Sequence, residues 1–293
     1  MTESDLIDKF LSVRAWQSGD KRAPHKSLLM LYALAQLQNN KEMFSYEEVE
    51  EKLMELLVNF GPPSKPRPQY PFVRLANDNI WSFDQPELIS SYKGVDPGRP
   101  FLIRHKIKGG FTSEIISFLK KHPDLINKLA LEIVANSFPE TIQEDILDAV
   151  GLNQNILPTA SRRKRDPAFR EKIMIAYEYQ CAVCGFNVRL GHQPLALEAA
   201  HIKWHQAGGP DEAQNGLALC SLHHKLFDLG AYTINDRFQL IVSDKVNGSR
   251  GKQEWLLDFH AKEIRRPQSK FYEPKDTYLE WHVNEVFKGY GRN

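Results

Sequence analysis

Apolar residues recur at helical spacing through most of the first half of the chain. In the segment 25–39 (HKSLLMLYALAQLQN), Leu28, Leu31 and Ala35 lie three or four positions apart, which predicts a helix with one buried face. Further helical patterns cover residues 112–120, 123–138 and 144–150. The first half is therefore predicted to be mainly helical.

Two local signals interrupt this helical pattern. The Ser45-x-x-Glu48 motif is a capping box that begins a helix, and Gly61-Pro-Pro ends it. After a proline-rich loop, residues 72–83 (FVRLANDNIWSF) place two apolar arms on either side of an Asn-Asp-Asn turn. This pattern predicts a small β-hairpin.

The second half alternates short apolar runs with helical segments. Residues 194–201 and 216–219 are predicted strands, and 222–229 is a predicted helix that follows them directly. The remaining predicted elements are a helix over 167–177, a hairpin with strands at 231–234 and 239–243, and a helix near 277–288. We therefore predict an α+β protein whose second half is built on two strands and a helix.

Composition bounds the class of protein. With 42% hydrophobic and 26% charged residues the chain is globular, and its net charge of +1 does not by itself indicate a nucleic-acid partner. No apolar run approaches the roughly 20 residues that span a membrane, and the N-terminus lacks a signal-peptide core. The few cysteines, all at metal-ligand spacing, are typical of a reducing compartment, so we expect a cytoplasmic protein with no membrane partner.

Residues 153–166 have the composition of a linker between two domains, residues 1–152 and 167–293. Pro158 and the polar residues around it break the periodicity of the preceding helices. Four adjacent positive charges then follow, at Arg162, Arg163, Lys164 and Arg165. A basic run of this kind is either a solvated surface or a contact with nucleic-acid phosphates.

All three cysteines of the chain lie in one short block with several histidines. Cys181 and Cys184 form a C-x-x-C pair, and Cys220 with His223 forms a C-x-x-H pair further along. Two such pairs can supply the four ligands of one tetrahedral structural zinc. The pairs alone are equally consistent with a zinc knuckle that has no catalytic role.

Three polar residues beside these pairs, His201, Asn215 and His224, are not needed as zinc ligands. The order Glu-Ala-Ala-His201-Ile, Gly-Gly-Pro-Asp, Asn215-Gly-Leu-Ala-Leu-Cys and His-His224 resembles the HNH endonuclease family. The resemblance implies a ββα-metal fold in which His201 is the general base for water attack on phosphorus. It also implies that Asn215 fixes the loop or orients the His201 ring, and that His224 binds a catalytic Mg²⁺ or Mn²⁺.

The block departs from the family pattern at two positions. His223 replaces the usual second cysteine of the last pair, and imidazole also ligates zinc well. Ala200 stands where many relatives carry a second ligand of the catalytic ion, and Glu198 and Asp228 are the candidates to replace that ligand. Trp204 is expected to pack in the core.

A second resemblance covers most of residues 10–120. Its motifs are Arg22-Ala-Pro24-His25-Lys26-Ser-Leu-Leu-Met-Leu-Tyr, Phe60-Gly-Pro, Tyr70-Pro71-Phe-Val-Arg74-Leu and Gly109-Gly-Phe. They resemble the sulfur-binding domain, whose members recognise phosphorothioate DNA, in which sulfur replaces a non-bridging phosphate oxygen. Such a domain followed by an HNH unit implies a type IV restriction endonuclease that acts on modified DNA.

The chemistry of sulfur agrees with this resemblance. Sulfur is less hydrated than oxygen, so a shallow apolar pocket tolerates it and penalises an oxygen that must lose its water. Pro24, Tyr70 and Pro71 are the predicted pocket residues. His25 and Lys26 are predicted to contact neighbouring phosphates, and Arg74 is predicted to reach a phosphate or a guanine edge.

The sequence thus predicts an enzyme that binds phosphorothioate duplex DNA and cuts nearby phosphodiester bonds. Because one HNH centre cuts one strand, double-strand cleavage suggests a homodimer. Two alternatives stay open at this point. One is a methylation-dependent or non-selective HNH DNase, and the other is a non-catalytic protein that binds modified DNA through a purely structural HNH fold.

Overall fold

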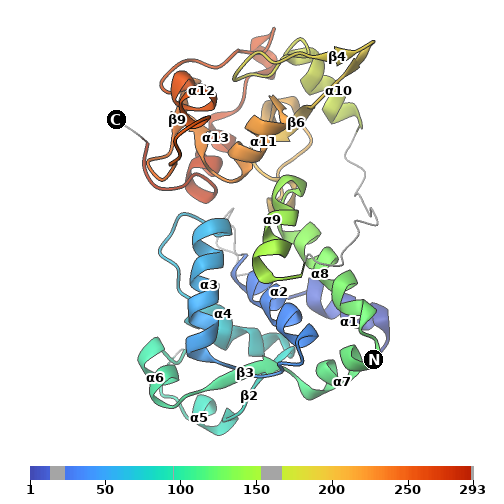
Figure 1. Cartoon of the computed structure of the whole chain (residues 1–293), viewed down its shortest axis with the longest axis vertical. Coiled ribbons are helices and arrows are strands. Elements are labelled where there is room, and N and C mark those ends of the chain that lie inside the picture. The colour runs from blue at the N-terminus through green and yellow to red at the C-terminus, as the bar shows by residue number, and fades with distance from the viewer. Residues whose placement is uncertain (14–23, 95, 153–166, 292–293) are drawn as a thin grey trace. The chain divides into compact units, whose positions relative to one another are not determined.

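The computed structural model describes residues 1–13, 24–94, 96–152 and 167–291 (Figure 1). The described residues divide into two compact units, one that ends at residue 152 and one that begins at residue 167. The predicted basic linker lies outside the described residues. Each unit has its own buried core, and the two are treated separately.

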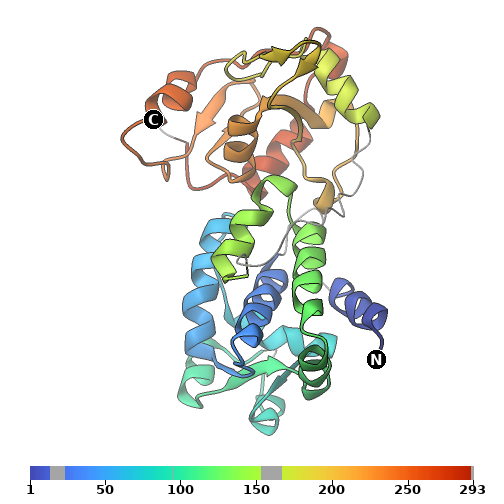
Figure 2. The ribbon, with the colours of Figure 1, turned by 45° about the vertical axis from the view of Figure 1, so that its right-hand side comes forward.

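The first unit is a helical assembly around α2 (His25–Gln38). Nine of the fourteen residues of α2 are buried, which agrees with the predicted helix and adds burial on more than one face. It packs against α3 (Tyr46–Phe60), α8 (Asp124–Ser137) and α9 (Glu140–Val150). Figure 2 shows α1 (Glu3–Leu11), which the sequence pattern did not predict, beside α8. The predicted capping box is present at the start of α3, where Ser45 and Glu48 bond each other's backbone N–H groups.

A three-stranded antiparallel sheet covers one end of this assembly. Its order is β1 (Phe44–Ser45), β3 (Lys108–Phe111), β2 (Trp81–Phe83), so the central strand is the last in sequence. The central strand needs its glycines, because a Cβ on Gly110 would lie 2.0 Å from the Glu42 carbonyl oxygen. The other helices of the unit are α4 (Gln69–Arg74), 3-10 helix η1 (Leu75–Asp78), α5 (Pro86–Ser90), α6 (Arg99–Arg104) and α7 (Ser113–Lys121).

The hairpin predicted over residues 72–83 is wrong. Its first arm is helical, in α4 and η1, and only its second arm forms a strand. Asn79 takes the left-handed conformation of a turn residue (φ 58°), as the Asn-Asp-Asn pattern indicates, but it ends a 3-10 helix. The strand that follows pairs with β3, so that Trp81 lies opposite Phe111. The sheet is therefore completed by the pairing of β2 with β3, which is distant from it in the sequence.

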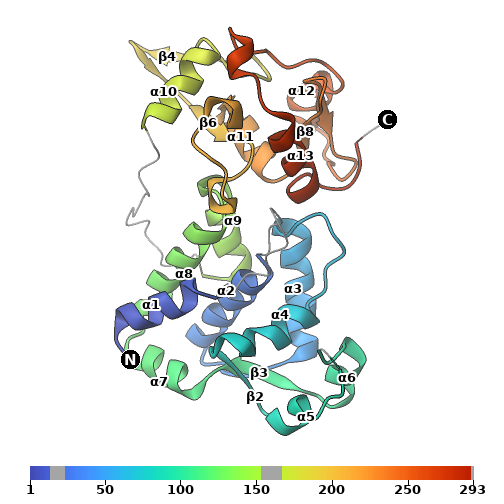
Figure 3. The ribbon, with the colours of Figure 1, turned by 180° about the vertical axis from the view of Figure 1, so that it is seen from behind.

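The second unit is built on a two-stranded sheet and a helix. Strands β6 (Leu197–His201) and β7 (Gly216–Cys220) pair antiparallel, with His201 opposite Gly216 and Leu197 opposite Cys220. Helix α11 (Ser221–Asp228) follows β7 directly, and α10 (Pro167–Ala176) packs on both strands (Figure 3). Gly216 lets α10 approach, because a Cβ there would lie 2.4 Å from Ile173 Cδ1.

Smaller elements surround this ββα group. They are β4 (Arg189–Leu190), β5 (Gln193–Pro194), β8 (Tyr232–Ile234), β9 (Leu240–Val242), α12 (Lys252–Trp255), α13 (Asp276–Glu285) and the 3-10 helices His205–Ala207, Ala213–Asn215, Leu257–Phe259 and Lys270–Tyr272. Strands β8 and β9 form the predicted second hairpin, in which the Asn235 side chain accepts from two backbone N–H groups of the turn.

The protein is therefore α+β, with a mainly helical first unit and a ββα group in the second. Among the described residues, no helix is long and apolar enough to cross a membrane.

Candidate functional site

The four predicted zinc ligands come together in the second unit. Cys181 and Cys184 lie in the turn after α10, Cys220 ends β7, and His223 lies in the first turn of α11. Their ligand atoms all lie within 4.8 Å of one another. The Sγ atoms of Cys184 and Cys220 are 4.0 Å apart, close to the separation of about 3.8 Å that zinc–sulfur bonds of 2.3 Å impose in a tetrahedron. The cluster fits a zinc ion in both size and ligand type.

The electrostatics of the cluster also suit a cation. Hydrogen bonds from Cys184 and, to a smaller extent, from Cys220 hold the pKa of the Cys181 thiol far below its ordinary value. Burial alone would lower the pKa of His223, but its contacts with the sulfur atoms of Cys181 and Cys220 raise it to about 9. His223 Nδ1 faces these sulfur atoms, and Nε2–H donates to the Trp255 carbonyl at 3.0 Å. Such an outer acceptor fixes the tautomer of a metal-binding imidazole.

His201 ends strand β6 and is held on two sides. Its Nε2 lies 2.7 Å from Asp211 Oδ1, in the loop between β6 and β7. Its ring stacks on Phe169 of α10, with centroids 4.1 Å apart and planes at 14°. The Asp211 contact was not predicted from the sequence, although Asp211 belongs to the Gly-Gly-Pro-Asp motif that carried the family resemblance. An imidazole whose orientation is set in this way can serve as a general base.

Asn215 is fully buried and holds the loop that follows His201. Its Oδ1 accepts from Lys203 N–H at 2.8 Å, while its Nδ2 donates to the carbonyls of Lys203 and Pro210, each at 3.0 Å. Of the two roles considered for Asn215, these bonds correspond to fixing the loop. The backbone of the adjoining segment is tied as well, because Ile202 N–H donates to the Asn215 carbonyl.

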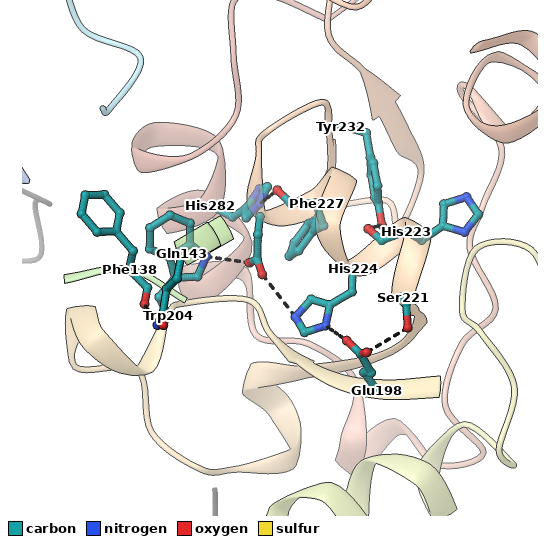
Figure 4. A network of polar contacts seen from close by, with 11 residues as sticks. Phe138, Gln143, Glu198, Trp204, Ser221, His223, His224, Phe227, Tyr232 and His282 are labelled. Carbon is teal, nitrogen blue, oxygen red and sulfur yellow. Dashed lines mark hydrogen bonds and ion pairs between the residues drawn. The ribbon is translucent and has the colours of Figure 1, made fainter. Parts of the chain in front are cut away.

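His224 lies between the two carboxylates that were considered as substitute metal ligands (Figure 4). Its Nδ1 is 2.6 Å from Glu198 Oε2, a hydrogen-bond distance. Its Nε2 is 3.3 Å from Asp228 Oδ2, one helical turn further along α11. Ligands of one octahedral ion at about 2.1 Å lie about 3 Å apart, so the second spacing, unlike the first, suits two atoms that share a cation.

The helix that carries His224 also contacts a buried histidine of α13, His282, whose role the sequence pattern did not reveal. His282 of α13 stacks flat on Phe227, with centroids 3.7 Å apart, and donates from Nε2 to the Phe227 carbonyl at 3.1 Å. Its Nδ1 meets the Thr233 hydroxyl at 2.9 Å. A lone histidine in a helical pattern carries no local signal of such a role, because the contacts join residues far apart in sequence.

The predicted sulfur-pocket residues lie on two packed helices of the first unit. Pro24 precedes α2, His25 and Lys26 begin it, and Tyr70, Pro71 and Arg74 lie on α4, which contacts α2. An ion pair of 2.5 Å joins Lys26 to Asp78, in the 3-10 helix directly after α4. The two groups of residues are thus linked by a mostly buried charge pair.

Within α4, the side chains of Arg74 and Tyr70 contact each other. The Arg74 guanidinium carbon lies 4.6 Å from the centre of the Tyr70 ring, and its Nη2 is 2.7 Å from Asp96 Oδ2. Tyr70 is half-buried, whereas Pro24 and Pro71 are buried. The apolar surface of this group that remains accessible therefore comes mainly from Tyr70.

Two family models match different parts of the chain. Residues 3–155 match the model of the family described as ScoMcrA-like, DNA sulfur-binding domain, and residues 181–235 match that of HNH endonucleases. No curated protein matches the chain.

Three solved structures are similar to about half of this chain. The sulfur binding domain of ScoMcrA complexed with phosphorothioated DNA is 18% identical, with 50% of this chain and 94% of that chain covered and a TM-score of 0.43. The corresponding SprMcrA domain complexed with phosphorothioated DNA is 15% identical, with 52% and 96% covered and a TM-score of 0.44. The type IV phosphorothioation-dependent restriction endonuclease ScoMcrA is 19% identical, with 48% and 27% covered and a TM-score of 0.40.

Proposed function

The chain belongs to the ScoMcrA-like, DNA sulfur-binding domain family and carries an HNH endonuclease domain, and we propose that it is a restriction endonuclease for phosphorothioate-modified duplex DNA. The HNH domain makes the protein a nuclease. One observation supports the proposal above all others: a single chain combines two parts. Residues 3–155 match the sulfur-binding family, and the ββα unit that follows holds His201 and His224 beside carboxylates. In this proposal residues 1–152 select the DNA, residues 153–166 link the domains and contact phosphates, and residues 167–293 cut.

His201 is the proposed general base. With the proton on Nε2 donated to Asp211, the ring's lone pair lies on Nδ1, which is the atom that would take a proton from the attacking water. Stacking on Phe169 holds the ring plane while this transfer occurs. Asn215 supports the step indirectly, because it fixes the backbone of Lys203, two residues after the base.

His224 and Asp228 are the proposed protein ligands of the catalytic ion. Their facing atoms, Nε2 and Oδ2, have the spacing expected of neighbouring ligands. Glu198 is then the outer partner that accepts from His224 Nδ1–H and keeps Nε2 available for the ion. A bound Mg²⁺ or Mn²⁺ would polarise the scissile phosphate and stabilise the leaving 3′ oxygen. Asp228 thereby takes over the ligand role that Ala200 cannot fill.

The cluster of Cys181, Cys184, Cys220 and His223 is the proposed structural zinc site. Two of its members come from the start of the domain and two from the junction of β7 and α11. A zinc ion there would tie the first turn of α11 to the segment after α10. His224 is the next residue after His223, so a zinc ion held by the cluster would also fix the position of the helix that carries His224.

Recognition is proposed to depend on Tyr70 and the charged residues around it. The Tyr70 ring would meet the sulfur. Pro24, directly before α2, and Pro71, within α4, are buried and have no backbone N–H, so they would offer no donor to an oxygen at that position. Lys26, His25 and Arg74 would contact the flanking backbone or base edges, with Arg74 held ready by Asp96. A homodimer is proposed for cleavage of both strands.

The test is cleavage of two matched plasmids, one with phosphorothioate links and one without, in Mg²⁺ or Mn²⁺. We expect the wild type to cut only the modified plasmid and His201→Ala to cut neither. His192→Ala is the matched control, because His192 is an exposed histidine outside the site and its loss should leave cleavage unchanged. Equal cutting of both plasmids would keep the nuclease and reject sulfur recognition. No cutting of these or of methylated DNA would favour the non-catalytic alternative.

A further inference from the structure

The two carboxylates beside His224 each accept a hydrogen bond on the oxygen that does not contact the imidazole. Glu198 has Oε2 on His224 Nδ1 and Oε1 on the Ser221 hydroxyl, which donates at 2.8 Å. Asp228 has Oδ2 near His224 Nε2 and Oδ1 on the Trp204 indole N–H, which donates at 2.9 Å. Figure 4 shows Ser221, Glu198, His224 and Trp204 along this chain of contacts. Each carboxylate is therefore held by a hydrogen bond through the oxygen that does not contact His224.

The Trp204 indole is itself rigidly placed. Its ring is almost fully buried and meets Trp281 of α13 edge-on, with centroids 6.0 Å apart. Its backbone carbonyl accepts from Ala207 and Gly209, each at 2.9 Å. The residue before it, Lys203, is the one that Asn215 holds through both N–H and C=O. The bond from Trp204 to Asp228 thus joins the loop after the proposed base to the helix that carries the proposed metal ligands.

We propose that Trp204 is a positioning residue for the catalytic ion, acting through the Asp228 carboxylate. This inference rests on the proposed role of His224 and Asp228 as ligands. The terminal torsion of an aspartate is soft, so the carboxylate plane is poorly set by the side chain alone. Indole nitrogen is a donor only, so it must face a carboxylate oxygen and cannot compete for the cation. With Oδ1 held, Oδ2 stays beside His224 Nε2, and the two-ligand site is preformed.

The alternative is that Trp204 only fills space between the loop and α13. Trp204→Phe separates the two roles, because phenylalanine keeps an aromatic ring and removes the N–H. Trp281→Phe is the matched control: it makes the same change in the other ring of the pair. Both variants are made in the full chain and loaded with zinc, and Mn²⁺ affinity is measured by calorimetry together with the Mn²⁺ dependence of cleavage.

We expect Trp204→Phe to weaken Mn²⁺ binding about tenfold or more, the usual effect of losing an outer partner of a metal ligand. Saturating Mn²⁺ should restore most of the cleavage rate, which a packing defect would not allow. Trp281→Phe should bind Mn²⁺ within about threefold of the wild type. In an Asp228→Asn background, adding Trp204→Phe should change the affinity by less than about threefold, because the two residues act on one ligand.

Wild-type affinity in folded Trp204→Phe, or equal weakening in Trp281→Phe, would overturn the positioning role. Wild-type Mn²⁺ affinity in the Asp228→Asn single variant is a different failure, since it rejects the ligand assignment on which the inference rests. If the two substitutions are fully additive, Trp204 acts elsewhere than through Asp228, and the inference is wrong even if Asp228 is a ligand.

Discussion

Asn215→Ala is expected to destabilise the nuclease unit strongly, even though Asn215 is a polar residue in a loop. The side chain is 0% exposed and makes three hydrogen bonds, all to backbone groups of the loop after His201. Its removal leaves one N–H and two carbonyls without that partner. At the lower bound of about 1 kcal/mol for each unsatisfied buried group, the free energy of unfolding should fall by about 3 kcal/mol.

The assay is urea unfolding of the zinc-loaded chain, followed by tryptophan fluorescence, which reports on Trp204, Trp255 and Trp281 in this unit. With a urea dependence of about 2 kcal/mol per molar, a loss of 3 kcal/mol moves the midpoint down by about 1.5 M. Gln214→Ala is the control, because it removes a neighbouring amide side chain and keeps the backbone carbonyl that accepts from Lys275. Its midpoint should move by less than about 0.5 M, a shift of about 1 kcal/mol at the same slope.

The reasoning is refuted if Asn215→Ala unfolds at the same urea concentration as Gln214→Ala. Such a result would mean that water or a rearranged loop replaces all three bonds. The catalytic effect of Asn215 would then have to come from direct contact with His201 or DNA. If stability falls as expected, cleavage by the folded variant should fall as well, because the backbone that follows His201 is no longer held.

Three further outcomes follow from the site and its surroundings. Cys184→Ala should lower the zinc content, measured by atomic absorption, from about one ion per chain. The second unit should unfold in this variant, while the helical circular-dichroism signal of the first unit should remain. Tyr70→Ala should weaken binding to phosphorothioate duplex at least tenfold in a gel-shift assay, with little change for unmodified duplex; equal losses on both would contradict the sulfur contact. Hydrogen bonds from Lys275, and to a smaller extent from Tyr278, hold the pKa of Glu212 below its ordinary 4.5. The ionised Glu212 carboxylate therefore stabilises the fold above pH 4.5, and this stabilisation is lost as the pH falls through the lowered pKa. Glu212→Gln should therefore cost about 1 kcal/mol or less near pH 7, and thermal melts should show this difference shrinking as the pH falls through the lowered pKa of Glu212.

Local patterns were sufficient for most helices and for the ββα group. The capping box at Ser45 and Glu48 marks the start of α3 because both partners are within one turn. The hairpin at 72–83 failed for the opposite reason. Short apolar arms look alike whether they form a strand or a buried helix, and the partner of β2 is Gly109 and its neighbours in β3, which no local signal near residue 80 identifies.

The candidate site shows the same contrast between short-range sequence patterns and contacts that only the fold reveals. Ligand spacing was enough to predict that Cys181, Cys184, Cys220 and His223 come together, because C-x-x-C and C-x-x-H pairs each bring two ligands within one turn. Sequence alone left Glu198 and Asp228 as equal candidates. The structure adds the distances on which the proposed ligand assignment rests, 2.6 Å from His224 Nδ1 to Glu198 Oε2 and 3.3 Å from His224 Nε2 to Asp228 Oδ2. The contacts of Trp204 and His282 cross from one element to another and became visible only in the fold.

The central claim is that one chain reads a sulfur atom with its first unit and cuts with its second. The most direct measurement uses His201→Ala and a pair of short duplexes that differ by a single sulfur. The account predicts that this variant binds the sulfur duplex at least tenfold more tightly than the oxygen duplex and cuts neither, while the wild type cuts the sulfur duplex. Equal affinity for the two duplexes, or cleavage by His201→Ala at the wild-type rate, would contradict it.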